Sequence, residues 1–195
     1  MKNDIIVAIA RQHGSGGRTI GKRLAEKLGV PFYDRELIFL AAKESGLSEN
    51  CVKELEEKPS RSLLYNMYTT GESLTVSDHI FIAQAKVINE IADKGGCVIV
   101  GRCSDYVLRE RQNCKKVLIY APFEERVARV RDEYQEIGKG AEQYLEKIDK
   151  KRAAYYLNST MEKWGNPLNY DICINSTIGI EESADIIYTF LEKCR

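Results

Sequence analysis

A glycine-rich segment near the start of the chain has residue types suited to binding phosphate. Segment 12–19 reads Gln-His-Gly-Ser-Gly-Gly-Arg-Thr and lies between an apolar run at 5–10 and a helical pattern at 19–28. At such a strand-to-helix turn, successive backbone N–H groups and the helix N-terminus can surround a phosphate. Arg18 can reach phosphate oxygens, and the Thr19 hydroxyl can bind magnesium. The predicted phosphate-binding residues are His13, Gly14, Ser15, Gly16, Gly17, Arg18 and Thr19.

The segment resembles a P-loop, whose usual pattern is Gly-x-x-x-x-Gly-Lys-Ser/Thr. Two positions differ from that pattern, since Gln12 takes the place of the first glycine and Arg18 replaces the lysine. An arginine side chain is always charged but is larger and forked, so phosphate contact is expected with a changed geometry.

A dinucleotide-binding turn is an alternative interpretation of the same glycines. Gly14 and Gly16 match the first two glycines of that fingerprint, and Asp34 follows about 20 residues later, where a ribose would be held. Thr19 occupies the third glycine position, however, and the loop is longer than the fingerprint requires. This alternative predicts an oxidoreductase, for which the chain lacks an evident Tyr-x-x-x-Lys motif.

The composition is that of one globular domain without a strong overall field. The 195 residues carry 29 basic and 29 acidic side chains, so the net charge of zero gives no general attraction for nucleic acid or anionic lipid. The longest apolar run, 5–10, is far shorter than a membrane-spanning helix or a signal-peptide core. We therefore expect neither a nucleic-acid partner nor a membrane partner.

Cysteine and histidine usage argues against a metal or disulfide framework. The six cysteines include no Cys-x-x-Cys pair, and His13 and His79 are the two histidines. Scattered cysteines in apolar runs are typical of a reducing compartment, so a cytoplasmic protein is expected.

Apolar patterns along the chain alternate between strand and helix. Five strand-like runs are expected near 5–10, 31–34, 97–100, 117–120 and 170–174, with helical patterns between them. This alternation predicts a five-stranded parallel sheet covered by helices on both faces, a three-layer α/β/α fold. Ligands then belong at the carboxyl ends of the strands.

Beyond the glycine-rich loop, several further segments resemble the cytidylate kinase-like family, within the P-loop nucleoside monophosphate kinases. They extend nearly to the end of the chain and are 21–29, 31–34, 98–102, 117–126, 149–156, 163–165 and 169–175.

The resemblance implies a P-loop kinase fold and a phosphoryl-transfer reaction. Residues 1–195 would form a single domain, with a helical acceptor-binding region at about 35–95 and two lid helices at about 126–157. The implied reaction moves the γ-phosphoryl group of ATP to a small acceptor, a nucleoside monophosphate such as CMP or dCMP, with Mg²⁺. Such a transfer needs positioning and cations rather than a nucleophilic triad.

The resemblance also assigns roles outside the loop. Arg102, after the third strand, would hold the acceptor phosphate, and Asp34 would bind magnesium or the acceptor. Arg129 and Arg152, in the lid segment, would join Arg18 as catalytic cations. Where cytidylate kinases continue with aspartate after this arginine, the chain has Cys103, so the base of the acceptor stays open.

A regulatory protein that binds a nucleotide without efficient transfer is a further alternative, because two P-loop positions are changed. In each nucleotide-binding case the expected partners are small-molecule nucleotides, with a homo-oligomer as a possible assembly.

Overall fold

The computed structural model describes residues 4–34, 40, 43, 76–132 and 140–194. Most of the predicted acceptor-binding region and part of the predicted lid connection lie outside these residues. In chain order the elements are β1 (Ile6–Arg11), α1 (Gly17–Leu28), β2 (Phe32–Tyr33), α5 (Val76–Asp93), β3 (Cys97–Val100), α6 (Ser104–Val107), β4 (Cys114–Tyr120), α7 (Phe123–Asp132), α8 (Ala141–Thr160), η1 (Pro167–Asn169), β5 (Ile172–Asn175), η2 (Ser176–Ile178) and α9 (Ile180–Lys193).

The five strands form one parallel sheet in the order β2-β3-β1-β4-β5, as the sequence predicts. The chain moves outward from β1 in both directions, which places β1 between β3 and β4. Ile9 pairs with Val100 and with Val117 on the two sides. The ends of β1, β2 and β3 therefore lie at one edge of the sheet, where the predicted site residues follow them.

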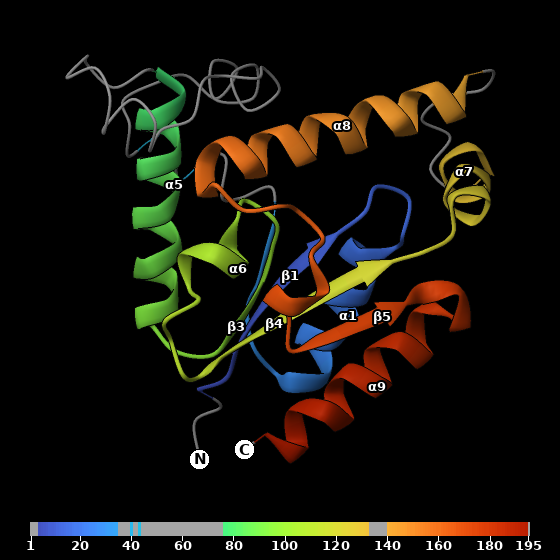
Figure 1. The fold of residues 1–195 in the computed structure, drawn as a ribbon. Helices are drawn as coiled ribbons and strands as arrows, with labels where there is room; N and C mark the ends of the chain where they lie inside the picture. The colour runs from blue at the N-terminus through green and yellow to red at the C-terminus, as the bar shows by residue number, and fades with distance from the viewer. Residues whose placement is uncertain (1–3, 35–39, 41–42, 44–75, 133–139, 195) are drawn as a thin grey trace.

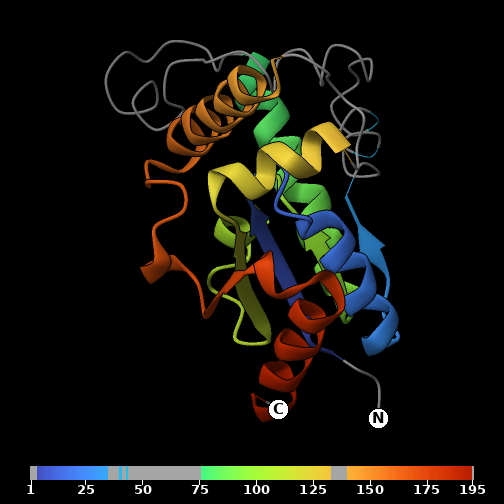
Figure 2. The ribbon, with the colours of Figure 1, turned by 90° about the vertical axis from the view of Figure 1, so that its right-hand side faces the viewer.

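Each face of the sheet is covered by helices because side chains of a strand point alternately to opposite faces. Val7 and Ile9 of β1 pack in one cluster with buried residues of α1 and α9, such as Leu24 and Ile187. Ile6 and Ala8 pack in a second cluster with apolar residues of α5. Figures 1 and 2 show the resulting three layers, which confirm the predicted fold class.

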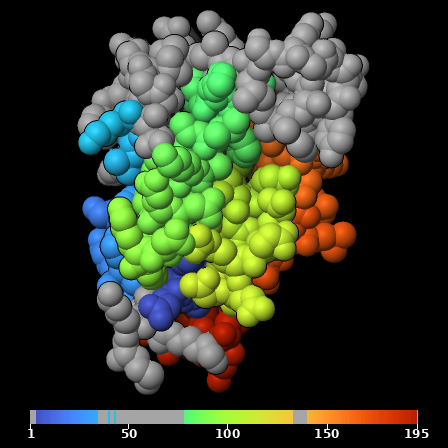
Figure 3. Space-filling model, turned by 90° about the vertical axis from the view of Figure 1, so that its left-hand side faces the viewer, coloured from blue at the N-terminus to red at the C-terminus, as the bar shows by residue number. Residues whose placement is uncertain are grey.

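Helix α5 lies on the outer face of the second cluster, and Figure 3 shows it beside the segments that contain β3, α6 and β4. Val87, Ile88 and Ile91 are its buried contacts with the sheet. Burial raises the pKa of Cys97 to about 11 and that of Cys114 to about 12, so these thiols are neutral members of the core. The cysteines in the described ranges form no disulfide.

Helices α7 and α8 correspond to the two helices predicted at about 126–157. They pack against each other through Val127, Val130, Ala141 and Leu145. Figure 1 shows α8 lying across the end of the sheet, above the strands. Within the described ranges, none of the helices combines the length and the apolar character needed to cross a membrane.

Candidate functional site

The glycine-rich loop joins β1 to α1 by a tight turn. The Gln12 amide continues the sheet by donating to Ile119 O at 3.0 Å, and the Ser15 amide and hydroxyl both donate to Gln12 O, at 3.3 and 2.9 Å. Gly14 and Gly16 both have φ +74°, a left-handed conformation that side chains rarely adopt. A Cβ atom on Gly14 would also lie 2.7 Å from Arg126 O. The loop therefore requires glycine at these positions.

Gln12 has a structural role at the position where the usual P-loop has glycine. Its side-chain Oε1 accepts a hydrogen bond from the Ala121 amide at 3.1 Å. Ala121 directly follows β4, so this bond ties the start of the loop to the neighbouring strand. The departure from the usual pattern thus adds a cross-link between β1 and β4.

A second anchor comes from the segment after β5. Ser176, fully buried in η2, donates its hydroxyl to Ser15 O at 2.6 Å. A Cβ atom on Gly16 would lie 2.5 Å from Cδ1 of Ile180, at the start of α9. The loop is therefore held from β4 and from the β5–α9 connection.

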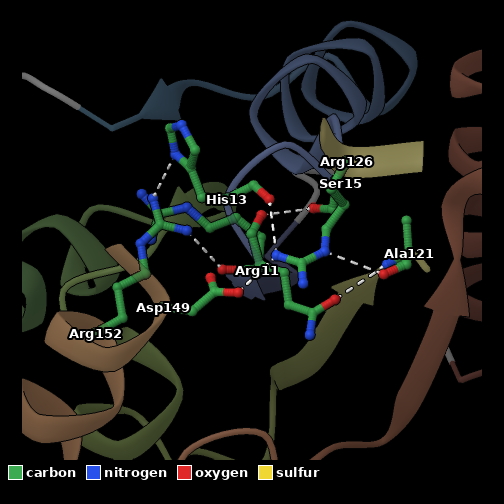
Figure 4. A network of polar contacts seen from close by, with 8 residues as sticks. Arg11, His13, Ser15, Ala121, Arg126, Asp149 and Arg152 are labelled. Carbon is green, nitrogen blue, oxygen red and sulfur yellow. Dashed lines mark hydrogen bonds and ion pairs between the residues drawn. The ribbon is translucent and has the colours of Figure 1, made fainter. Parts of the chain in front are cut away.

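Three arginines from α7 and α8 donate to the backbone around the loop, and Figure 4 shows Arg126 and Arg152 among them. Arg129 donates to Gly14 O at 2.9 Å, and Arg152 donates to Arg11 O at 3.0 Å. Arg126 donates to His13 O at 3.2 Å and to Ala121 O at 3.1 Å, and it pairs with Asp149 of α8 at 2.6 Å. Carbonyl groups around the loop are thereby satisfied by cationic donors.

His13 lies between α8 side chains. Its Nδ1 is 3.4 Å from an Arg152 nitrogen, and its ring meets the edge of the Tyr144 ring at a centroid distance of 5.6 Å. His13 therefore links the loop to α8, as well as standing where the sequence predicts a phosphate contact.

Arg18 and Asp34 form an ion pair across the end of the loop. Arg18 Nε lies 2.6 Å from Asp34 Oδ2, while an Arg11 nitrogen lies 3.6 Å from Asp34 Oδ1. Asp34 is buried, whereas the Arg18 side chain is 58% exposed. Arg18 can therefore swing away from Asp34 through solvent, but Asp34 is fixed at the end of β2.

The Gly101–Arg102 pair follows β3 directly and lies next to Arg11. Gly101 has φ +81°, and a Cβ atom there would collide with the Arg11 guanidinium. Arg102 and Cys103 both adopt left-handed conformations, with φ of 59° and 54°. The side chain of Arg11 thus crosses from β1 over the end of β3 toward Asp34.

Charged residues of α8 and of the turn after β3 both act on the pKa of Arg152. Burial lowers the pKa of its guanidinium, the Asp149 carboxylate opposes this shift, and the positive charge of Arg102 adds to it. Arginine stays protonated despite such shifts. The charge of Arg102 therefore acts on Arg152, which donates to Arg11 O at the end of β1.

The structure brings the predicted residues to one end of the sheet. Arg129 and Arg152 contact the loop directly, and Asp34 and Arg102 lie at the ends of the adjacent strands. Thr19 is exposed on the first turn of α1. Among the described residues, the His, Cys, Asp and Glu side chains form no cluster of three that could hold a metal by themselves.

Sequence reasoning missed several residues that build the site, namely Arg11, Gln12, Arg126, Asp149 and Ser176. Arg126 and Arg129 share a helix face by their spacing, which was a usable signal for Arg126. The partners of Gln12 and Ser176 lie 109 and 161 residues away in the chain, so no local pattern indicates them.

Comparison with solved structures defines the fold class as that of P-loop kinases. A gluconokinase from Sinorhizobium meliloti matches with a TM-score of 0.59 and 14% identity, covering 99% of this chain and 94% of its own. A shikimate kinase from Acinetobacter baumannii matches with a TM-score of 0.53 and 17% identity, covering 97% and 94%. At these identities the likeness concerns the fold alone.

A comparison of the sequence with models of known protein families identifies the family of this chain. The model of the cytidylate kinase-like family matches residues 6–178, and the chain belongs to this family. An uncharacterized protein from Eubacterium ventriosum has a similar structure, with a TM-score of 0.74 and 28% identity over 96% of this chain and 98% of its own. No curated protein sequence matches the chain.

Proposed function

We propose that the protein is an ATP-dependent phosphotransferase that moves the γ-phosphoryl group of ATP to CMP or dCMP. The observation that carries this proposal is the convergence of Arg129 and Arg152 on a glycine-rich phosphate loop, next to Arg102 and Asp34 at the adjacent strand ends. A kinase needs this arrangement because the reacting phosphates carry charge that must be positioned and neutralised.

The loop residues fit the phosphates of ATP. Left-handed glycines and a helix N-terminus present backbone N–H groups, and the loop carbonyls of His13 and Gly14 are already bound by arginines. Arg129 lies close to the loop, with one guanidinium nitrogen 3.5 Å from the position that a Cβ atom on Gly16 would occupy. Arg129 and Arg152 would therefore stabilise negative charge on the transferring group.

Magnesium would be held by the Thr19 hydroxyl and by Asp34. The Thr19 side chain is exposed, and the Asp34 carboxylate lies at the neighbouring strand end. Bound magnesium supplies charge neutralisation on the β- and γ-phosphate oxygens. Since Asp34 pairs with Arg18 and Arg11, Arg18 would exchange Asp34 for phosphate oxygens when the nucleotide enters.

Arg102 would bind the phosphate of the acceptor. Arg102 follows β3 after Gly101, and a guanidinium can bind a phosphate through two hydrogen bonds. An acceptor oxygen would then bond to the γ-phosphorus while the bond to the bridging oxygen breaks and ADP leaves. Because the structurally similar proteins include a shikimate kinase and a gluconokinase, shikimate and gluconate are further acceptors to test.

A nucleotide-binding regulatory protein is the second candidate function. The specific observation in its favour is the 2.6 Å ion pair between Arg18 and Asp34, which occupies the cation that phosphoryl transfer would need. This candidate predicts tight binding of MgATP without transfer to any acceptor.

A phosphoryl-transfer assay tests the proposal. The purified chain is incubated with MgATP and separately with CMP, dCMP, UMP, AMP, GMP, shikimate and gluconate, while ATP binding is measured by calorimetry. Arg18→Ala should lower kcat/KM by roughly 10²-fold, the size found when a donor to the transition state is removed. Arg23→Ala is the matched control, since Arg23 lies on the same helix and pairs with Glu26 and Glu181 at the surface.

The outcomes separate the candidates. Transfer to CMP or dCMP that Arg18→Ala reduces and Arg23→Ala preserves supports the proposed kinase. Transfer to another acceptor replaces the substrate, and MgATP binding without transfer favours the regulatory role. Binding of a nicotinamide dinucleotide in place of ATP would favour the oxidoreductase.

A further inference from the structure

The turn that carries Arg102 has a conformation that must be held by its surroundings. Arg102 and Cys103 are two consecutive non-glycine residues with positive φ, and each such residue costs free energy. The following helix, α6, spans only Ser104–Val107, and its N-cap residue Cys103 makes no side-chain cap. The turn therefore depends on contacts with other elements to keep Arg102 in place.

The core and α8 both hold this turn. On one side, Leu108 is fully buried and packs with Val107 in the cluster beneath α5. On the other side, the Tyr156 hydroxyl of α8 donates to Asp105 Oδ2 at 2.9 Å, and both side chains are buried. Burial raises the pKa of Asp105, while the hydrogen bond from Tyr156 opposes that shift. A buried carboxyl of this kind needs its hydrogen-bond donors.

Tyr156 shares one face of α8 with residues that contact the phosphate loop. Asp149, Arg152 and Tyr156 are spaced by three and four residues, which places them on the same side of a helix. Asp149 pairs with Arg126, and Arg152 donates to Arg11 O. This face of α8 therefore joins the surroundings of the glycine-rich loop to the turn that carries Arg102.

We propose that Asp105 and Tyr156 are positioning residues that fix the Arg102 turn relative to α8 and hold the Arg102 guanidinium where an acceptor phosphate binds. The positioning role is inferred from the contacts of Asp105, Tyr156 and Leu108. The binding of an acceptor phosphate by Arg102 rests on the proposed kinase function.

The first experiment needs no substrate. Arginine Nε–Hε signals are recorded by ¹H–¹⁵N NMR, and the Arg102 signal is assigned by its loss in Arg102→Lys. Tyr156→Phe and Asp105→Asn should shift or broaden this signal, and Tyr155→Phe should leave it unchanged. Tyr155 is the matched control because its hydroxyl donates at 2.8 Å to Gln84 of α5 instead. An Arg102 signal that responds equally to Tyr155→Phe and Tyr156→Phe, or to neither, overturns the proposal.

The second experiment uses transfer to CMP. Tyr156→Phe should raise the KM for CMP by about tenfold, a coupling of about 1.4 kcal/mol, while the KM for MgATP changes less than about twofold. In the Arg102→Ala background, Tyr156→Phe should add little, because the residue it positions is gone. Equal fold effects in both backgrounds would overturn the proposal.

The two experiments keep the proposals apart. A changed Arg102 signal in a chain that transfers phosphate to no acceptor supports the positioning role and removes the kinase function. Transfer to CMP with an unchanged Arg102 signal keeps the kinase function and removes the positioning role.

Discussion

Arg126 of α7 connects the glycine-rich loop to α8, so its loss should be costly. Its side chain is 6% exposed, and it donates to two backbone carbonyls while pairing with Asp149, whose side chain is 21% exposed. Arg126→Met keeps most of the apolar stem but removes the charge and all three contacts. Removing one partner of a buried pair costs about 3–5 kcal/mol. Since Asp149 keeps some access to water, we expect a loss of about 3 kcal/mol.

Urea unfolding measures this loss, with the free energy of unfolding extrapolated to water. Arg131→Ala is the matched control, because Arg131 lies on the same helix and pairs with Asp132 at an exposed site. That control should change the free energy of unfolding by less than about 0.5 kcal/mol.

A double-mutant cycle separates the ion pair from the other contacts of Arg126. Combining Arg126→Met with Asp149→Leu should cost less than the sum of the single changes by about 1–3 kcal/mol, because neither charge is then left without its partner. The reasoning is refuted if Arg126→Met loses less than about 1 kcal/mol or if the two changes are additive.

Three further changes test other parts of the site. Gly101→Ala should weaken CMP binding measured by calorimetry, since the new Cβ collides with the Arg11 guanidinium; unchanged affinity would contradict this contact. Ser176→Ala removes the hydroxyl bound to Ser15 O and should weaken MgATP binding by about 5- to 10-fold in the same assay, and an unaltered Kd would show that this anchor is dispensable. Burial raises the pKa of Asp105, so the folded chain binds a proton at this carboxyl more readily than the unfolded chain does. The free energy of urea unfolding of the wild type, relative to that of Asp105→Asn, should therefore fall as pH rises from about 4 toward the raised pKa. A difference that does not change with pH would contradict this prediction.

Local sequence patterns were sufficient to predict the sheet and the glycine-rich turn between β1 and α1. Residues Ile6–Arg11 form β1, and Ile20, Leu24 and Leu28 lie on the buried face of α1 as their spacing predicts. The bounds of later elements shifted, since β4 begins at Cys114 rather than 117 and β5 spans Ile172–Asn175 rather than 170–174. These shifts arise because pairing with β1 and β4 extends or limits a strand beyond its apolar run.

Parallel strand order also made part of the site predictable. Asp34 and Arg102 each follow a strand, and parallel strands end at the same edge of a sheet. The sequence could therefore indicate that both side chains lie near the glycine-rich loop. The sequence could not indicate that Arg18 and Arg11 both approach Asp34, because these contacts depend on the side-chain conformations in the folded chain.

The sequence by itself determined the fold class, the loop and the strand ends, because hydrophobic period and glycine spacing are local properties of the chain. Only the tertiary structure decided which buried polar groups meet. The pairs Arg126–Asp149 and Tyr156–Asp105 are separated by 23 and 51 residues and depend on how α8 lies across the sheet. A buried polar group takes whichever partner the packing of helices and strands brings within hydrogen-bond distance, and that partner leaves no periodic signal in the chain.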